Sequence, residues 1–98
     1  MSEACKLTHV FKRDGTYVPY SRQRISNAIY RAAVAVGGRD KDKAADLALK
    51  VEGIICENYS VDHPPMVEAV QDIVEKVLIE EGHATVAKHF ILYRATQN

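Results

Sequence analysis

Two adjacent cations near the amino-terminal end are the residues whose type and spacing most clearly indicate a binding role. Lys12 and Arg13 stand in the stretch "VFKRDGTYVPYS", directly before Asp14 and Gly15. An Asp-Gly pair tolerates the positive φ angles of a type I′ turn, so the stretch predicts a hairpin with the cations at its bend. Two cations that a tight turn holds in place would attract an anion, and a phosphate group is the ligand they favour.

A two-residue turn would also determine which residues of the hairpin face each other. The expected pairs are Arg13 with Thr16, Lys12 with Tyr17, and Phe11 with Val18. Strand alternation then puts side chains on two faces, the first with Val10, Lys12 and Tyr17, the second with His9, Phe11, Arg13 and Val18. A lone hairpin is only marginally stable in water, so we expect it to lie on other elements.

A helix is predicted to begin directly after the return strand, with Ser21 as its N-cap. Its unpaired amides and positive dipole end would add donors to an anion site beside the hairpin. Arg22 and Arg24 fall in the first turn, where each cation opposes the dipole by ~0.3 to 1 kcal/mol. Two explanations stay open: an anionic ligand compensates these arginines, or they pair with nearby acids or extend into water.

Four helices are expected to support the hairpin. The first ends at Gly37-Gly38, the second starts at Asp40 or Asp42 and fades near Asn58, the third follows Pro64-Pro65 and ends at Gly82, and the fourth covers residues 83 to about 96. Spacing of the i, i+3, i+4 kind makes the following residues inward-facing: Ile25, Ala28, Ile29, Ala32, Ala33, Val36, Ala44, Leu47, Ala48, Val51, Ile54, Ile55, Val67, Val70, Val74, Val77, Leu78, Val86, Ala87, Phe90, and Ile91 or Tyr93. The expected fold is α+β, a four-helix bundle capped by a small antiparallel β-hairpin, or by a three-stranded sheet if residues 60–62 add a strand.

Length and composition favour one globular domain over residues 1–98, because 47% of the 98 residues are hydrophobic and 27% are charged. No apolar run approaches the roughly 20 residues that cross a bilayer, and no signal peptide is evident, so we expect a cytoplasmic chain. Cys5 and Cys56 lack CxxC spacing, which predicts neither a zinc site nor a redox pair. Net charge is zero, but residues 1–39 hold seven Lys or Arg against two acids, and residues 40–98 hold six against eleven.

Catalytic signals are missing from the sequence. It has no GxSxG, HExxH or Walker motif, and none of its four histidines shares metal-ligand spacing with another His or Cys. We therefore expect no catalytic residues and no metal ligands. The chain is predicted to be a regulatory or binding domain and not an enzyme in its own right.

Two long stretches carry a resemblance to a known family. "VFKRDGTYVPYSRQRISNAI" resembles the V-x-K-R-D-G…V-P-[FY]-[SD]-x-x-[KR]-I opening of the ATP-cone, a regulatory nucleotide-binding domain. "VEAVQDIVEKVLIEEGHATVAKHFILYR" is similar to the I-Q-D-x-V-E-x-x-L and A-K-x-[FY]-x-x-Y-R motifs of its second half. The likeness extends from Val10 to Arg94, within a motif-covered region of residues 7–96.

The resemblance implies a domain that binds ATP or dATP, alone or with Mg²⁺, between the cap and the bundle. It further implies control of the activity or oligomerisation of a ribonucleoside-diphosphate or -triphosphate reductase, with the catalytic domain or other cone-bearing subunits as partners. The positions that match the family's nucleotide-binding residues are Val10, Lys12, Arg13, Ser21, Arg24, Val67, Gln71, Lys88 and Arg94.

Two departures from the family pattern affect these expectations. Val18 stands where many cones have an acidic residue that helps to hold the adenosine, which weakens the expected selectivity for adenine or deoxyadenosine. Only Cys5 precedes the motif, so the zinc ribbon of cone-bearing repressors is not expected, nor is direct DNA binding. The chain would then be an excised or a free-standing cone. The alternative functions are a nucleic-acid-binding module and a helical protein-interaction module without nucleotide selectivity.

Overall fold

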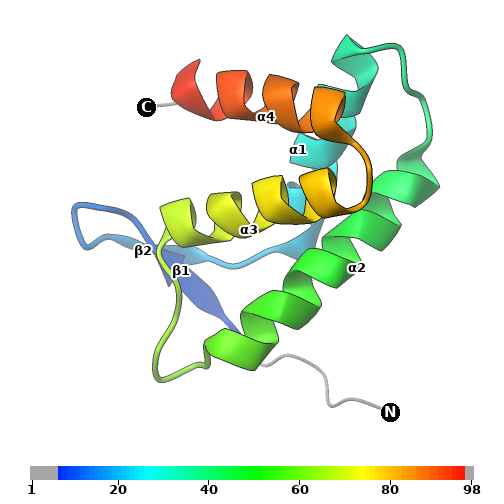
Figure 1. The fold of residues 1–98 in the computed structure, drawn as a ribbon. Helices are drawn as coiled ribbons and strands as arrows, with labels where there is room; N and C mark the ends of the chain where they lie inside the picture. The colour runs from blue at the N-terminus through cyan, green and yellow to red at the C-terminus, as the bar shows by residue number, and fades with distance from the viewer. Residues whose placement is uncertain (1–6, 97–98) are drawn as a thin grey trace.

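The computed structural model describes residues 7–96 of the chain. Its elements are β1 (His9–Phe11), β2 (Tyr17–Pro19), α1 (Arg22–Ala35), α2 (Lys41–Asn58), α3 (Val67–Glu80) and α4 (Ala84–Thr96). The main helix contacts join α1 to α2 and α4, and α3 to α2 and α4. In Figure 1 the hairpin of β1 and β2 lies at the N-terminal end of α3, and α4 runs along the other side of α3. The predicted α+β fold of four helices and a small antiparallel sheet is confirmed.

The helix ends follow the capping residues that the sequence predicts. Ser21 accepts a hydrogen bond from the Arg24 amide at 3.4 Å, and Asp40 accepts one from the Lys43 amide at 3.0 Å. Each bond satisfies one of the amides that an α-helix leaves unpaired at its start. Of the two candidate caps for α2, Asp40 is therefore the residue used.

The hairpin register differs from the prediction by one residue. The observed pairs are His9 with Pro19, Val10 with Val18, and Phe11 with Tyr17. The turn is a three-residue loop closed by the Gly15 amide on the Lys12 carbonyl at 2.9 Å. Gly15 has φ +89°, and within residues 7–96 positive φ occurs at glycines alone. Such a loop requires a left-handed residue only at the glycine, whereas a type I′ turn would also require one at Asp14.

This register puts Val10 and Val18 on one face and Phe11 and Tyr17 on the other, so the predicted face is wrong for both Val18 and Tyr17. A shift of one residue reverses every side chain of a strand. Val10 is buried and Val18 packs against the core. The register thus packs both valines against the helices, with Val10 buried and Val18 partly buried. Lys12 keeps its predicted position on the Val10 face.

No third strand forms at residues 60–62. Instead, the Ser60 amide donates to the His63 carbonyl, and the His63 amide donates to the Ser60 carbonyl. Within residues 7–96 the sheet has two strands, β1 and β2. Phe11 instead makes an isolated parallel bridge to Met66, and its amide donates to the Pro65 carbonyl at 3.1 Å. This bridge fixes the hairpin to the entry of α3.

The helices bury one continuous apolar core. Its buried helical residues are Ile25, Ile29, Ala32, Ala44, Leu47, Ala48, Val51, Ile55, Val70, Val74, Val77, Leu78, Ala87 and Phe90. Val36 was expected inside but is 39% exposed, because α1 ends one residue earlier. On α4, Tyr93 is half-buried and Ile91 is exposed, which decides between those two alternatives.

Cys56 on α2 is half-buried and disulfide-bonded, which the sequence analysis did not predict. Cys5 lies outside the described residues. Within residues 7–96, no helix combines the length and the hydropathy that a membrane span requires.

Candidate functional site

A cleft of about 180 Å³ lies where the hairpin meets the helices. Its walls come from the hairpin, the start of α1, the first half of α3 and the end of α4. The lining residues are Val10, Val18, Pro19, Tyr20, Ser21, Arg24, Ile25, Ala28, Val67, Val70, Gln71, Val74, Phe90 and Tyr93. Segments far apart in the sequence thus form a single concave surface.

The chemistry of the cleft is apolar with a few polar groups, as in most sites for small organic ligands. Tyr20, Phe90 and Tyr93 contribute aromatic rings, and aliphatic side chains fill most of the remaining surface. The polar groups of Arg24 and Gln71 also line it, and neither side chain hydrogen-bonds to another residue within the described part of the chain. These two side chains are therefore available to a ligand.

The N-terminus of α1 opens beside the cleft, because its N-cap Ser21 is one of the lining residues. The first turn of α1 contains no acidic side chain. Its positive dipole end and unpaired amides are therefore left to solvent or to an anion.

The two arginines of this first turn have different surroundings. Arg22 pairs with Glu52 of α2, with 2.9 Å between Nη1 and Oε1. Pairing with a nearby acid is thus confirmed as the explanation for Arg22. Arg24 lines the cleft, and among residues 7–96 its guanidinium has no acidic partner. For Arg24, which is exposed, two explanations stay open: compensation by an anionic ligand, or extension of the side chain into water.

Tyr20 connects the cleft to α2 and was not among the predicted site residues. Its hydroxyl donates to Glu52 Oε2 at 2.7 Å, so Glu52 binds both Tyr20 and Arg22. Burial raises the pKa of the Tyr20 hydroxyl well above its usual value near 10, and the hydrogen bond to Glu52 raises it further. Two sequence signals were available for Tyr20: it is the aromatic residue of the V-P-[FY]-[SD] family motif, and it stands directly before the N-cap, where a hydrophobic residue commonly packs on the helix.

Replacing Tyr20 by Phe should lower the free energy of unfolding by about 1.5 kcal/mol at pH 7, since the hydroxyl bonds to a charged group. Because the pKa of Tyr20 is raised in the folded state, its contribution is present below pH 10 and falls as pH rises above 10. In urea denaturation between pH 8 and 11, the free energy of unfolding should therefore fall more steeply with pH for the parent than for Tyr20→Phe.

Tyr59→Phe is the matched control, because the half-buried Tyr59 hydroxyl makes no hydrogen bond within residues 7–96. Tyr59→Phe should lower the free energy of unfolding by less than about 0.5 kcal/mol. Equal losses in the two variants at pH 7 would contradict a specific contribution of the Tyr20–Glu52 bond.

The structure brings five of the nine predicted binding residues together. Val10, Ser21, Arg24, Val67 and Gln71 all line the cleft. The four other predicted residues are Lys12, Arg13, Lys88 and Arg94, which do not line it.

Lys12 and Arg13 belong to the exposed hairpin turn. The Arg13 side chain is 77% exposed and pairs with Glu68 of α3 at 3.2 Å. Lys88 is exposed on α4. The two hairpin cations are thus near the α3 side of the site, and only a change of side-chain or hairpin position would bring them into the cleft.

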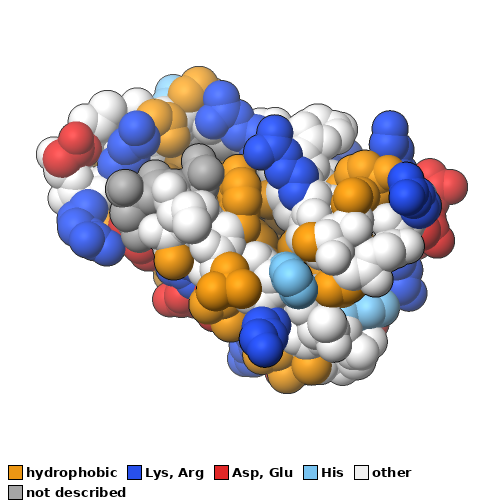
Figure 2. All heavy atoms as spheres, turned by 90° about the horizontal axis from the view of Figure 1, so that it is seen from above, with side chains coloured by type: hydrophobic (Ala, Val, Ile, Leu, Met, Phe, Trp, Pro, Cys, Tyr) orange, Lys and Arg blue, Asp and Glu red, His pale blue; other side chains and the backbone are white. Residues whose placement is uncertain are grey.

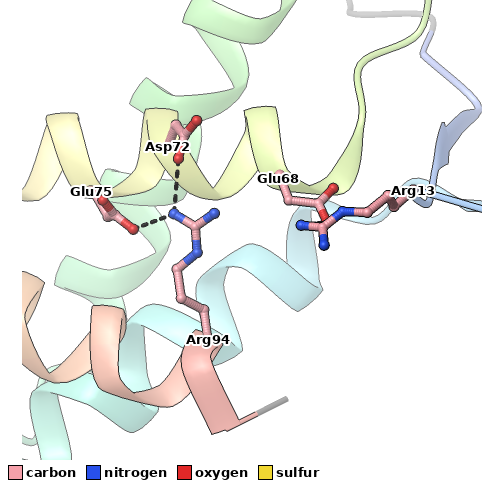
Figure 3. Close-up of polar contacts among 5 residues, drawn as sticks. All are labelled: Arg13, Glu68, Asp72, Glu75 and Arg94. Atoms are coloured by element: carbon pink, nitrogen blue, oxygen red, sulfur yellow. Dashed lines mark hydrogen bonds and ion pairs between the residues drawn. The ribbon is translucent and has the colours of Figure 1, made fainter. Parts of the chain in front are cut away.

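Arg94 reaches from α4 to α3, as Figure 3 shows. Its Nη1 donates to Asp72 Oδ1 at 2.9 Å and also to Glu75 Oε2. Burial opposes the charge of Arg94, but hydrogen bonds to Asp72 and Glu75 outweigh burial and raise its pKa. In this arrangement Arg94 holds two helices together, and a role in binding phosphate stays a prediction of the family resemblance.

The aromatic walls of the cleft could not be identified as such from the sequence. Phe90 was predicted to face inward from the last helix, with Ile91 or Tyr93 beside it, and Phe90 and Tyr93 also stand at the aromatic positions of the A-K-x-[FY]-x-x-Y-R family motif. Neither signal says that the rings line a cleft. Whether an inward side chain reaches the core or the rim of a cleft depends on how the helix crosses its neighbours.

On one face of the molecule, Lys and Arg are the more widespread charged side chains (Figure 2). Figure 2 shows Lys and Arg side chains spread among exposed hydrophobic surface, while the visible Asp and Glu side chains lie toward the edges. This face can attract anions although the net charge of the chain is zero.

Comparison with known proteins agrees with the sequence resemblance. The family model described as "ATP cone domain" matches residues 8–98. A vitamin B12-dependent ribonucleoside-diphosphate reductase of Thermoplasma acidophilum is 38% identical over 93 residues, which cover 90% of this chain and 12% of the relative.

Other relatives belong to different reductase types. Ribonucleoside-diphosphate reductase subunit alpha of Treponema pallidum is 38% identical over 88% of this chain and 11% of its own length. Anaerobic ribonucleoside-triphosphate reductase of Salmonella typhimurium is 37% identical over 88% of this chain and 12% of its own length. The chain thus spans about an eighth of the length of the curated relatives it matches. With nearly all of its residues matched by the family model, the chain belongs to the ATP-cone family.

Proposed function

We propose that the chain is an allosteric regulatory domain that binds ATP or dATP in the cleft between the hairpin and the helices. Membership of the ATP-cone family supports the general role, since these are nucleotide-binding regulatory domains of ribonucleotide reductases. The observation that carries the proposal is the position of Arg24. This cation lines an apolar cleft without an acidic partner in the described part of the chain, at the N-terminus of a helix.

The two halves of a nucleotide fit different parts of the cleft. The aromatic and aliphatic walls offer a purine base an apolar surface, with the Gln71 amide available for hydrogen bonds. The triphosphate would meet Arg24 and the first amides of α1, with Lys12 and Arg13 approaching from the hairpin. A Mg²⁺ ion bound with the ligand would be held mainly by phosphate oxygens.

The cleft is too small to enclose a whole nucleoside triphosphate with the hairpin in its present position. Its volume of about 180 Å³ is below the ~300 to 1,000 Å³ typical of sites that enclose a small ligand. A bound triphosphate must therefore lie partly outside it or displace the cap. Movement of a two-stranded hairpin that is bridged to α3 at Phe11 would change the surface that a partner meets.

The proposed partner is the rest of a ribonucleotide reductase, because the relatives that carry a similar segment are reductases of three types. Nucleotide binding would control either the activity or the oligomerisation of that enzyme. If two nucleotides favoured two cap positions by about thirtyfold, the coupling free energy would be about 2 kcal/mol, which is ordinary for allostery.

A thermal-shift series with ATP, dATP, GTP and CTP tests the proposal. A ligand at 100 times its Kd that binds only the folded state stabilises it by about 2.7 kcal/mol. We expect this increase with ATP and dATP and little with GTP or CTP. The shifts with ATP and dATP should be similar, because Val18 lines the cleft without offering the sugar a charged acceptor.

Equal shifts with all four nucleotides would contradict adenine recognition and favour a site for polyphosphate alone. No shift with any of them, at millimolar concentration, would contradict nucleotide binding and favour a protein-interaction module.

A further inference from the structure

The ion pair between Arg13 and Glu68 joins two elements that border the cleft. Arg13 belongs to the hairpin loop, and Glu68 lies in the first turn of α3, next to the cleft residue Val67. The distance between Arg13 Nη2 and Glu68 Oε2 is 3.2 Å. Figure 3 shows the two side chains approaching each other from the hairpin and from α3. Arg13, which the family resemblance predicts to bind phosphate, is thus paired with a carboxylate of α3.

The carboxylate of Glu68 is held in place more firmly than its partner. The Glu68 side chain is 30% exposed against 77% for Arg13. Its second oxygen, Oε1, is buried and has no hydrogen-bond partner within residues 7–96. The helix position of Glu68 therefore keeps a negative charge at the edge of the site, while the long Arg13 side chain is free to change partners.

We propose that Glu68 sets the affinity of the cleft for polyphosphates by competing with them for Arg13, an inference that rests on the nucleotide-binding function proposed above. A guanidinium matches the geometry of carboxylates and phosphates equally, and it cannot direct the same donors to both. Exposed ion pairs contribute little stability, so a triphosphate can displace Glu68. The cost of that exchange, together with repulsion between Glu68 and the phosphates, reduces the observed affinity.

The exchange also links binding to the position of the hairpin. In the structure, the ion pair of Arg13 with Glu68 ties the hairpin loop to the start of α3. When phosphates take over Arg13, this tie is lost, and the loop follows the ligand instead of α3. Glu68 thereby influences the concentration at which nucleotide acts and the position of the hairpin loop, while the backbone bridge at Phe11 holds the base of the hairpin.

The test compares Glu68→Gln with Glu81→Gln in the whole chain by calorimetry with ATP and with inorganic tripolyphosphate. Each variant removes one negative charge and breaks one ion pair. Glu68 pairs with Arg13, and Glu81 pairs with Lys50 at 2.9 Å. Glu81 is the C-cap of α3, at the opposite end of the helix from Glu68. We expect Glu68→Gln to bind both ligands about two- to fivefold more tightly than the parent, and Glu81→Gln to match the parent within error.

The outcomes separate this inference from the proposed function. Weaker binding by Glu68→Gln would show that Glu68 contacts the ligand directly, and equal changes in the two variants would reduce the effect to net charge; either result overturns the competition and leaves nucleotide binding intact. If the parent does not bind ATP, both the competition and the proposed nucleotide-binding function are overturned.

Hydrogen exchange measured without added nucleotide tests the tie between loop and helix independently of affinity. The Gly15 amide in the hairpin loop should exchange faster in Glu68→Gln than in Glu81→Gln. Equal exchange in both would contradict the tie between loop and helix.

Discussion

Replacing Arg24 by Ala should weaken the binding of ATP and dATP by about ten- to a hundredfold. A hydrogen bond to a charged group is worth about 1.5 to 3 kcal/mol, and each 1.4 kcal/mol changes affinity tenfold. The estimate applies here because Arg24 lines the cleft and has no acidic partner in the described part of the chain. Isothermal titration calorimetry with each nucleotide measures the effect directly.

Arg22→Ala is the matched control for this variant. Arg22 lies in the same helical turn, and its removal changes the net charge by the same amount, but its guanidinium is occupied by Glu52 and does not line the cleft. The affinity of the Arg22→Ala variant for nucleotide should stay within about twofold of that of the parent. Removing a cation from a helix N-terminus stabilises the helix by ~0.3 to 1 kcal/mol, so unfolding would not explain a loss of binding by Arg24→Ala. Equal losses in both variants would reject a specific role for Arg24.

Leu78→Ala should lower the free energy of unfolding by about 3 kcal/mol, within the 2 to 5 kcal/mol usual for such truncations. Leu78 is 0% exposed and is among the largest fully buried side chains of the core. A domain of this size has about 5 to 15 kcal/mol of stability in total, so the variant would lose a large share of it. Urea denaturation followed by circular dichroism at 222 nm gives the difference.

Ile79→Ala serves as the neighbouring control, because Ile79 is the next residue of α3 but is 56% exposed. Its effect on the free energy of unfolding should stay within about 0.5 kcal/mol. Comparable losses in the two variants would mean that α3 does not pack with Leu78 inward and Ile79 outward, and the description of the core would be wrong.

The sequence alone indicated the four helices, the hairpin and, to within a few residues, where the helices begin and end. Ser21 and Asp40 are caps whose side chains bond to amides three residues ahead, and such signals are complete within one short stretch of chain. The apolar spacing likewise identified the inward faces, with exceptions at places such as Val36, where the helix had already ended. The family motifs have the same local character, which is why they could be recognised before the fold was known.

The tertiary structure decided how those elements meet. An Asp-Gly pair is compatible with a two-residue or a three-residue loop, and the choice depended on burying Val18 together with Val10 against the helices. The sequence could suggest Arg24 as a binding residue, but only the crossing of α1 and α2 showed that its neighbour Arg22 is occupied by Glu52.

The same reason explains the ion pairs of Arg13 and Arg94. Their partners Glu68, Asp72 and Glu75 lie on one helix, at distances along the chain that no local pattern encodes. Which charges pair, and which stay available to a ligand, depends on the directions in which packed helices present their side chains. Those directions exist only once the core has formed.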